Sequence, residues 1–257
     1  MVPHSKLIHK LSSYGIRGQL LQWFASFLQN RTQSIVIDSM ESSKVTVKSG
    51  VPQGSVIGPF LFNIYVNDLA DSTECDLFLF VDDTKLFTEV NVLDDSARLQ
   101  RDLNRISTWA SNNQLQFSAE KCVVIHLGRN NINANYILDS QSLQSSEEER
   151  DLGVIVDASL KFNKHVAAKV AKASQMLAII KRSFSHLDED SFVQLYKSLV
   201  RPHLEFASSV WSPYTVSNIS SIERVQKRAT KSMPHREFNV TFISYAHLKT
   251  LWLILYH

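Results

Sequence analysis

The spacing of apolar residues predicts a chain of mixed helices and strands whose second part is entirely helical. Apolar residues recur at helical intervals in several segments, which we predict as helices. These are two helices within residues 5–28, one over 60–69, one over 94–113, and four over 162–184, 189–206, 216–232 and 243–256.

Shorter runs predict the strands. Residues 34–38 and 44–48 alternate between apolar and polar positions, as the two strands of a hairpin do. Residues 121–128 and 151–157 each predict one further strand. The polar segment between these two predicts a loop with one short strand, at 136–138.

The stretch from Leu77 to Phe87 gives the most distinctive strand signal. Five apolar residues, ending at Val81, run into the adjacent carboxylates Asp82 and Asp83, and a second apolar run follows. This order predicts a strand, a tight acidic turn and a returning strand. Because the first strand is apolar on both faces, we expect it inside a sheet that is covered on both sides. Strands and helices together predict an α+β fold.

Composition places the chain among globular proteins. It has 257 residues, of which 44% are hydrophobic and 20% are charged, enough for one large domain or two modest ones. No run of apolar residues has the length of a membrane span, and the first residues lack the apolar core of a signal peptide. With only Cys75 and Cys122 present, we expect a reducing, intracellular compartment.

The net charge of +2 hides an asymmetry between the two parts of the chain. Residues 1–159 hold 13 Lys and Arg against 19 Asp and Glu, a net charge of −6. Residues 160–257 hold 14 against 6, a net charge of +8. The acidic part is suited to metal ions and the basic part to a polyanion, although ordinary surface charge is the simpler explanation.

The acidic turn is the first candidate site. Two carboxylates at the tip of a hairpin repel each other unless a cation lies between them. Mg²⁺ or Mn²⁺ suits such oxygen ligands. The alternative is a solvated turn, since aspartate is common in turns.

A loop rich in glycine and proline is the second candidate. Residues 50–59 hold three of the seven glycines and two of the six prolines. Glycines let the backbone approach a ligand closely, and prolines stiffen a loop. Gln53 places an amide there that can hydrogen-bond a base or a sugar. A plain turn before a helix explains the glycines but not this glutamine.

Basic residues follow the later helices. Arg224, Lys227, Arg228 and Lys231 fall on one face of the helix predicted at 216–232. Such a face can follow a phosphate backbone, while a solvated helix surface is the alternative. The helix predicted at 162–184 contributes further cations without any acid; among them are Lys164, Lys169 and Lys172.

Taken in order, these motifs resemble the reverse transcriptase of non-LTR retrotransposons, the LINE type, nearest to jockey-like and CR1-like elements. Ser49–Leu69 is similar to the family's Gly-Val-Pro-Gln-Gly-Ser block, and Phe80–Asp83 to its aromatic-x-Asp-Asp box. Val81 stands where the family more often has alanine. Further similarities continue to the later helices; they lie at Leu115–Cys122, Asp151–Val154, Leu195–Glu205 and Val225–Thr230.

The resemblance implies a fold and a reaction. Residues 1–158 would form part of the fingers and palm, an antiparallel sheet with packed helices, and residues 159–257 a mainly helical region similar to the thumb or connection. The reaction would be RNA-directed DNA synthesis, a nucleotidyl transfer with an RNA template, a DNA primer and deoxynucleoside triphosphates. Two Mg²⁺ or Mn²⁺ ions would assist it. The family also implies a nuclear or cytoplasmic location, and it leaves the oligomeric state open.

The resemblance also assigns roles to residues. Asp82 and Asp83 would be catalytic metal ligands, and Lys121 would protonate or neutralise the leaving group. The other assignments concern binding: Pro52, Gln53 and Gly54 to nucleotide and template, Leu152 and Gly153 to the primer as its grip, and Lys164, Lys169, Lys172, Arg224, Lys227, Arg228 and Lys231 to the nucleic-acid backbone.

One expected motif is not found in the sequence. The family places another catalytic carboxylate in a Phe-Asp box just before the segment that corresponds to Val2–His4. We therefore expect a truncated copy that extends primers weakly or not at all on its own. Two alternatives remain at this point. One is a catalytically dead remnant that at most binds nucleic acid, and the other is an unrelated metal-dependent phosphohydrolase.

Overall fold

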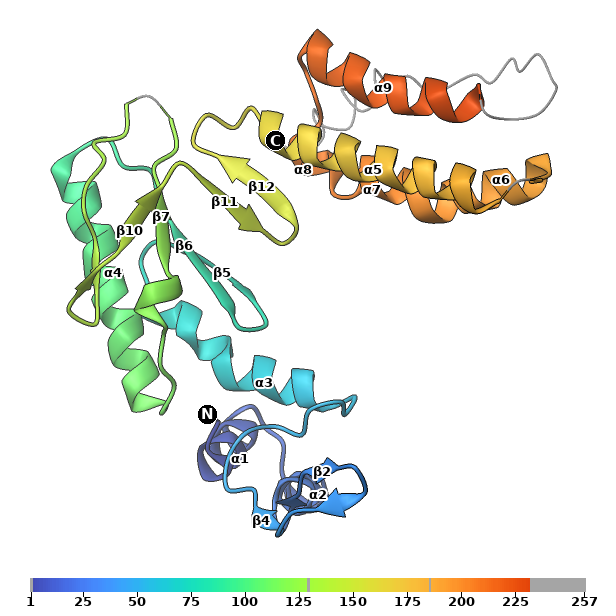
Figure 1. The fold of residues 1–257 in the computed structure, drawn as a ribbon. Helices are drawn as coiled ribbons and strands as arrows, with labels where there is room; N and C mark the ends of the chain where they lie inside the picture. The colour runs from blue at the N-terminus through green and yellow to red at the C-terminus, as the bar shows by residue number, and fades with distance from the viewer. Residues whose placement is uncertain (1, 129, 185, 232–257) are drawn as a thin grey trace. The chain divides into compact units, whose positions relative to one another are not determined.

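The computed structural model describes residues 2–128, 130–184 and 186–231, which form two compact units. The first unit contains residues 2–124 and 130–145, and the second contains residues 125–128 and the described residues from 146 onward. Figure 1 shows their helices and short strands. This mixture of helices and small antiparallel sheets confirms the predicted α+β fold. The helix predicted at 243–256 lies outside the described residues.

Four α-helices build most of the first unit, close to the predicted positions. They are α1 (His4–Ser13), α2 (Gly18–Leu28), α3 (Gly58–Val66) and α4 (Leu93–Asn112), with 3-10 helices at Asn67–Ser72 and Ala119–Lys121. Gly15 lies between the first two helices with φ of +89°, a conformation that glycine adopts without a steric cost. Leu7, Leu11, Leu61 and Tyr65 are fully buried in the core that these helices share.

The first strands of this unit pair differently from the prediction. They are β1 (Thr32–Gln33), β2 (Val36–Ile37), β3 (Met40–Glu41) and β4 (Val45–Thr46). β2 pairs with β3, and β1 pairs with β4, so the expected pairing of 34–38 with 44–48 is wrong. The reason is a tight turn at Asp38 and Ser39, whose φ values of +48° and +67° suit a two-residue hairpin loop.

The acidic turn joins β5 (Asp76–Phe80) to β6 (Asp83–Phe87), as predicted. The expected burial of both faces is wrong, however. Leu79 packs against the core, but Phe78 and Phe80 on the opposite face are 58% and 56% exposed. In the described part of the chain this sheet has two strands, and its outer face is occupied by Phe78 stacked on Phe87, with ring centroids 5.4 Å apart.

The polar segment predicted as a loop contains more strands than expected. β7 (Val123–Ile125) pairs with β10 (Gln144–Ser146), and β8 (Ile137–Leu138) pairs with β9 (Gln141–Ser142). Only β8 was predicted inside this segment. The other strands are polar because they are mostly exposed, and main-chain pairing does not require apolar side chains.

The second unit begins with a hairpin where a single strand was predicted. β11 (Glu148–Asp151) and β12 (Val154–Asp157) are antiparallel, and Leu152 and Gly153 form the turn between them. Their φ values are +45° and +86°. Strand β11 was not predicted because it contains a run of glutamates, and charged residues are unusual in strands.

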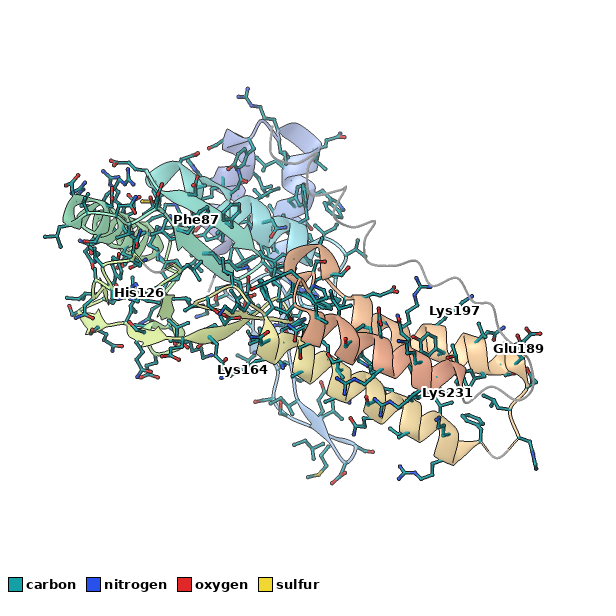
Figure 2. The ribbon with its side chains drawn as sticks, turned by 90° about the horizontal axis from the view of Figure 1, so that it is seen from above. Phe87, His126, Lys164, Glu189, Lys197 and Lys231 are labelled. Carbon is teal, nitrogen blue, oxygen red and sulfur yellow. The ribbon has the colours of Figure 1, made fainter. Side chains whose placement is uncertain are left out.

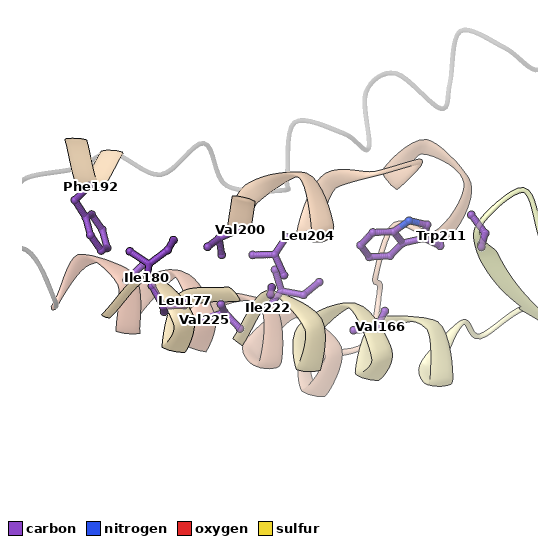
Figure 3. Close-up of a cluster of buried hydrophobic side chains, with 12 residues drawn as sticks. Val166, Leu177, Ile180, Phe192, Val200, Leu204, Trp211, Ile222 and Val225 are labelled. Carbon is purple, nitrogen blue, oxygen red and sulfur yellow. The ribbon is translucent and has the colours of Figure 1, made fainter. Parts of the chain in front are cut away.

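Helices form the rest of the second unit. They are α5 (Asn163–Ser183), α6 (Glu189–Leu195), a π-helical turn at Tyr196–Val200, α7 (Arg201–Glu205), α8 (Ser208–Trp211) and α9 (Val216–Thr230). The predicted helix 189–206 is thus interrupted by the π-helical turn, and α8 was not predicted. Apolar side chains of α5, α7, α8 and α9 meet in one buried cluster (Figure 3). No helix among the described residues is long and apolar enough to span a membrane.

Candidate active site and nucleic-acid surface

The carboxylates Asp82 and Asp83 lie at the tip of the hairpin β5–β6. Val81 and Asp82 form its two-residue turn, and Asp83 is paired with Phe80 as the first residue of β6. Val81 has a φ of +56°, which is unfavourable for a β-branched residue. Strain of this kind costs about 1–3 kcal/mol and is common where a turn must present functional groups.

Both carboxylates are exposed and available to a ligand. Within the described part of the chain, neither side chain has a hydrogen-bond or ion-pair partner. Two adjacent carboxylates suit a hard divalent cation, which prefers oxygen ligands and would relieve their repulsion. Among the described residues, no group of three or more His, Cys, Asp or Glu side chains is gathered at one place. The hairpin therefore presents two adjacent carboxylates that a divalent cation could use as ligands.

The glycine- and proline-rich loop is a closed turn that presents Gln53. The Ser55 N–H donates to the Pro52 carbonyl at 3.4 Å, and the Ser55 hydroxyl donates to the same carbonyl at 2.7 Å. The Gly58 N–H donates to that hydroxyl at 2.9 Å. Gly54 has a φ of +75°, as the third residue of a type II turn requires. Gln53, the residue before it, is exposed at the tip.

Lys121 lies in the 3-10 helix Ala119–Lys121 and is exposed, where a strand was predicted to begin. Among the residues that the structure describes, no hydrogen bond or ion pair joins Lys121, Gln53 and the two carboxylates to one another. The structure places each of these side chains on an accessible surface, and their roles stay predictions.

In the second unit, the turn of Leu152 and Gly153 lies against an aromatic ring. A Cβ atom on Gly153 would be 3.1 Å from Cε1 of Phe206, so this ring occupies the space where a side chain at position 153 would begin. The ammonium group of Lys169 lies over the same ring, 5.1 Å from its centroid. The predicted primer grip and one predicted backbone contact therefore meet at Phe206.

The remaining basic residues lie along α5 and α9, which run side by side (Figure 1). Lys164 and Lys231, near the start of α5 and just after α9, are marked in Figure 2. The three cations of α9 and Lys231 just after it are exposed, while Ile222 and Val225 of the same helix are buried, in agreement with the prediction that these cations share one face.

Several of these cations already have a partner. Lys164 forms an ion pair with Glu148 of β11 at 2.8 Å, and Lys227 a longer one with Glu223 at 3.4 Å. Arg228 donates to the hydroxyl of Ser174 on α5 at 2.9 Å. These partners are half-buried at most and their contacts with the exposed cations are weak in water, so the cations remain accessible to phosphate.

Four residues with unusual surroundings were not singled out from the sequence. Asp102 and His165 are fully buried, Trp211 is almost fully buried, and Phe206 supports the turn of β11–β12. Asp102 alone carried a signal, because it lies on the apolar stripe of its helix between Leu99 and Ile106. The others depend on contacts between segments that are far apart in the sequence.

Comparison with known proteins gives a consistent picture. The model of a family described as reverse transcriptase (RNA-dependent DNA polymerase) matches residues 1–169. The RNA-directed DNA polymerase from the mobile element jockey of Drosophila melanogaster is 28% identical over 230 residues, covering 83% of this chain and 25% of that polymerase. The corresponding polymerase of Drosophila funebris is 27% identical over 248 residues, covering 90% and 26%.

A third relative is the probable RNA-directed DNA polymerase from transposon X-element of Drosophila melanogaster. It is 28% identical over 221 residues, covering 80% of this chain and 24% of the relative. The chain thus spans about a quarter of the length of these curated relatives. These matches confirm the resemblance that the motifs indicated.

Proposed function

Since the chain belongs to the reverse transcriptase family, we propose that it forms the catalytic hairpin and the duplex-binding helices of an RNA-directed DNA polymerase of the non-LTR retrotransposon type. The observation that carries this proposal is the exposed pair Asp82 and Asp83 at the hairpin tip, within the part of the chain that matches the family. The substrates would be an RNA template, a DNA primer and deoxynucleoside triphosphates.

Polymerases of this family generally work with divalent metal ions. We propose that Asp82 and Asp83 supply ligands for Mg²⁺ or Mn²⁺, because their carboxylates are adjacent and unpaired by other side chains of the described residues. Such ions, when bound, activate the primer hydroxyl and stabilise the leaving pyrophosphate. The described residues contribute two carboxylates to this site.

The other residues would bind and orient the substrates. Gln53, held at the tip of its closed turn, would hydrogen-bond the nucleotide or the template, with Pro52 and Gly54 shaping the turn. Lys121 would neutralise the charge of the leaving group. Leu152 and Gly153 would brace the primer, and the cations of α5 and α9 would hold the phosphate backbone.

The metal proposal is tested by titrating Mn²⁺ into the purified chain and measuring the free ion by electron paramagnetic resonance. We expect the Asp82→Asn/Asp83→Asn double variant to bind Mn²⁺ at least about tenfold more weakly, because an amide carries no charge for the ion. The matched control is Asp94→Asn/Asp95→Asn, which removes two adjacent charges at the start of α4. Equal Mn²⁺ binding by the parent and the Asp82/Asp83 variant would contradict the proposal.

Primer extension on an RNA template tests the reaction itself. Any extension that the chain supports should require Mg²⁺ or Mn²⁺ and should be abolished in Asp82→Asn. Extension that continues in this variant would show that the hairpin is not catalytic. Hydrolysis of a simple phosphodiester without primer and template would instead indicate a phosphohydrolase.

A further inference from the structure

A closed set of contacts joins the hairpin β11–β12 to the helices of its own unit. The ring of Phe206 lies beside Gly153 in the turn, and the Phe206 carbonyl accepts a hydrogen bond from Trp211. Trp211 packs against His165, and His165 accepts a hydrogen bond from Ile155, back in the hairpin. None of these contacts is a main-chain hydrogen bond within a helix or between paired strands.

The first contact supports a turn with an unfavourable backbone. Leu152 has a φ of +45°, in the left-handed region that leucine rarely adopts, and it is 45% exposed. A buried anchor would explain an apolar residue in such a turn, but Leu152 is not buried. The turn is supported instead by the ring of Phe206, which lies beside Gly153.

Trp211 holds Phe206 in place. Its Nε1–H donates to the Phe206 carbonyl at 2.7 Å, and its side chain is only 1% exposed. Between these two residues, Ala207 has a φ of +53°, so the chain turns sharply after Phe206. A buried tryptophan with a satisfied N–H is a rigid support for such a turn.

His165 of α5 provides the last contact in this closed set, back to the hairpin. In a hairpin with a two-residue turn, the two residues that flank the turn form a hydrogen-bonded pair. The next pair, Arg150 and Ile155, therefore has N–H groups that point away from the partner strand. The N–H of Ile155 donates to Nδ1 of His165 at 3.0 Å. The hairpin is thereby anchored two residues after its turn.

The histidine is unusual for its surroundings. It is fully buried, and its Nε2 has no hydrogen-bond partner among the described residues. Its ring lies 5.0 Å from the ring of Trp211, tilted by 56°. An aliphatic side chain would fill this space without leaving a polar atom unpaired, so packing alone does not account for a histidine here.

We propose that His165, Trp211 and Phe206 are positioning residues that fix the turn of Leu152 and Gly153 relative to the start of α5 and its lysines. This inference rests on the proposed function in one respect, namely that the turn braces a primer. The positioning itself is a property of the fold, because the closed set of contacts begins at the hairpin turn and ends at His165, in the first turn of α5. Lys164 and Lys169 of this helix would then contact the same duplex at a set distance from the primer end.

The experiment compares His165→Leu with His165→Asn. Leucine fills the space but cannot accept a hydrogen bond, whereas the Oδ1 atom of asparagine lies as many bonds from the backbone as Nδ1 does. We expect hydrogen exchange at the Ile155 amide to accelerate by about tenfold or more in His165→Leu, and to return toward the parent rate in His165→Asn. Trp211→Phe, which removes the N–H donor and part of the ring system but keeps an aromatic ring, is the second variant, should His165→Leu fail to fold. It should accelerate the same exchange by a smaller factor.

A pair of glycine variants tests the contact at the turn. Gly153 and Gly128 both have a φ of +86°, but a Cβ on Gly128 meets nothing within 4 Å, whereas one on Gly153 meets Phe206. Gly153→Ala and Gly128→Ala therefore carry the same backbone strain and differ in this contact. We expect Gly153→Ala to weaken binding of a fluorescent RNA–DNA primer–template several-fold more than Gly128→Ala, and Phe206→Leu to reduce the difference.

The two readouts separate the inference from the function on which it rests. Unchanged exchange at Ile155 in both His165→Leu and Trp211→Phe would overturn the positioning role, whatever the chain binds. Altered exchange without any binding of primer–template by the parent chain would preserve the positioning role and refute the proposed function. Equal binding by Gly153→Ala and Gly128→Ala would refute the role of Phe206.

Discussion

At the scale of single residues, the chemistry of His165 sets a pH dependence. Burial lowers the pKa of its imidazole from 6.5 to about 4, and Lys169 and Arg150 act in the same direction. In the unfolded chain this histidine takes up a proton near its ordinary pKa, but in the folded chain only at much lower pH. Acid therefore favours the unfolded state.

We expect the free energy of unfolding to fall as the pH drops from about 6.5 to about 4, by up to about 3 kcal/mol. Denaturant unfolding at several pH values measures this, and His165→Asn should flatten the profile in that window. The exposed His9→Asn is the control and should leave the profile unchanged. The same slope in His165→Asn and in the parent would show that another group is responsible.

For single residues, the sequence predicts position better than role. Asp82, Asp83 and Gln53 were identified because they interrupt apolar or glycine-rich runs, and the structure places all three at exposed turn tips. His165 and Phe206 were not, because their surroundings come from residues about 10 and 50 positions away along the chain. Neither local periodicity nor composition contains such contacts.

At the scale of elements, Asp102 fixes helix α4 to the start of strand β5. Its Oδ2 accepts the N–H groups of Glu74 and Cys75 at 2.9 and 2.7 Å, and its Oδ1 accepts from Arg105 at 2.8 Å. Burial alone would raise the pKa of this carboxyl, but the hydrogen bonds outweigh it and hold the pKa below its usual range. The carboxylate is thus part of the fold at neutral pH.

Asp102→Asn should lower the free energy of unfolding by about 2 kcal/mol, because an amide replaces one acceptor oxygen with a donor that faces N–H groups. Denaturant unfolding of the variant measures this decrease. Asp94→Asn, in the exposed first turn of the same helix, should change stability by less than about 0.5 kcal/mol. A similar small change in Asp102→Asn would mean that the helix is held by packing alone.

Elements differ in how well the pattern predicts them. Helices α1, α4, α5 and α9 were predicted within a few residues, because each buries one apolar stripe over at least two turns. The strands around Glu148 and Gln144 were missed, since their side chains are polar and only main-chain pairing defines them. The outer face of β5 was predicted to be buried because phenylalanine is typical of cores, but Phe78 and Phe80 are exposed.

At the scale of the whole molecule, the charge asymmetry predicts how the chain binds nucleic acid. The excess of positive charge lies in residues 160–257, and its described cations are largely exposed along α5 and α9. Binding of a duplex through such a surface releases counterions and weakens steeply with salt. It should not require a metal, so EDTA should leave it unchanged.

The prediction concerns the slope of log affinity against log salt, measured by fluorescence anisotropy with an RNA–DNA duplex. Replacing Arg224, Lys227, Arg228 and Lys231 by glutamine should reduce this slope by about 0.9 for each phosphate that these cations neutralise in the parent chain. The matched control replaces four exposed cations of the first unit, Arg17, Arg31, Lys44 and Lys48. If the control reduces the slope as much as the α9 variant does, the basic helices are not the binding surface.

The way the strands pair has a consequence for synthesis of the chain. Among the described residues, every sheet either joins two successive strands or encloses one smaller hairpin, as β1–β4 encloses β2–β3 and β7–β10 encloses β8–β9. No pairing crosses another. Each ribbon can therefore close from its turn outward as soon as its last strand leaves the ribosome, with only short loops to order. We therefore expect strand pairing to follow the order of translation, because no pairing depends on a distant segment.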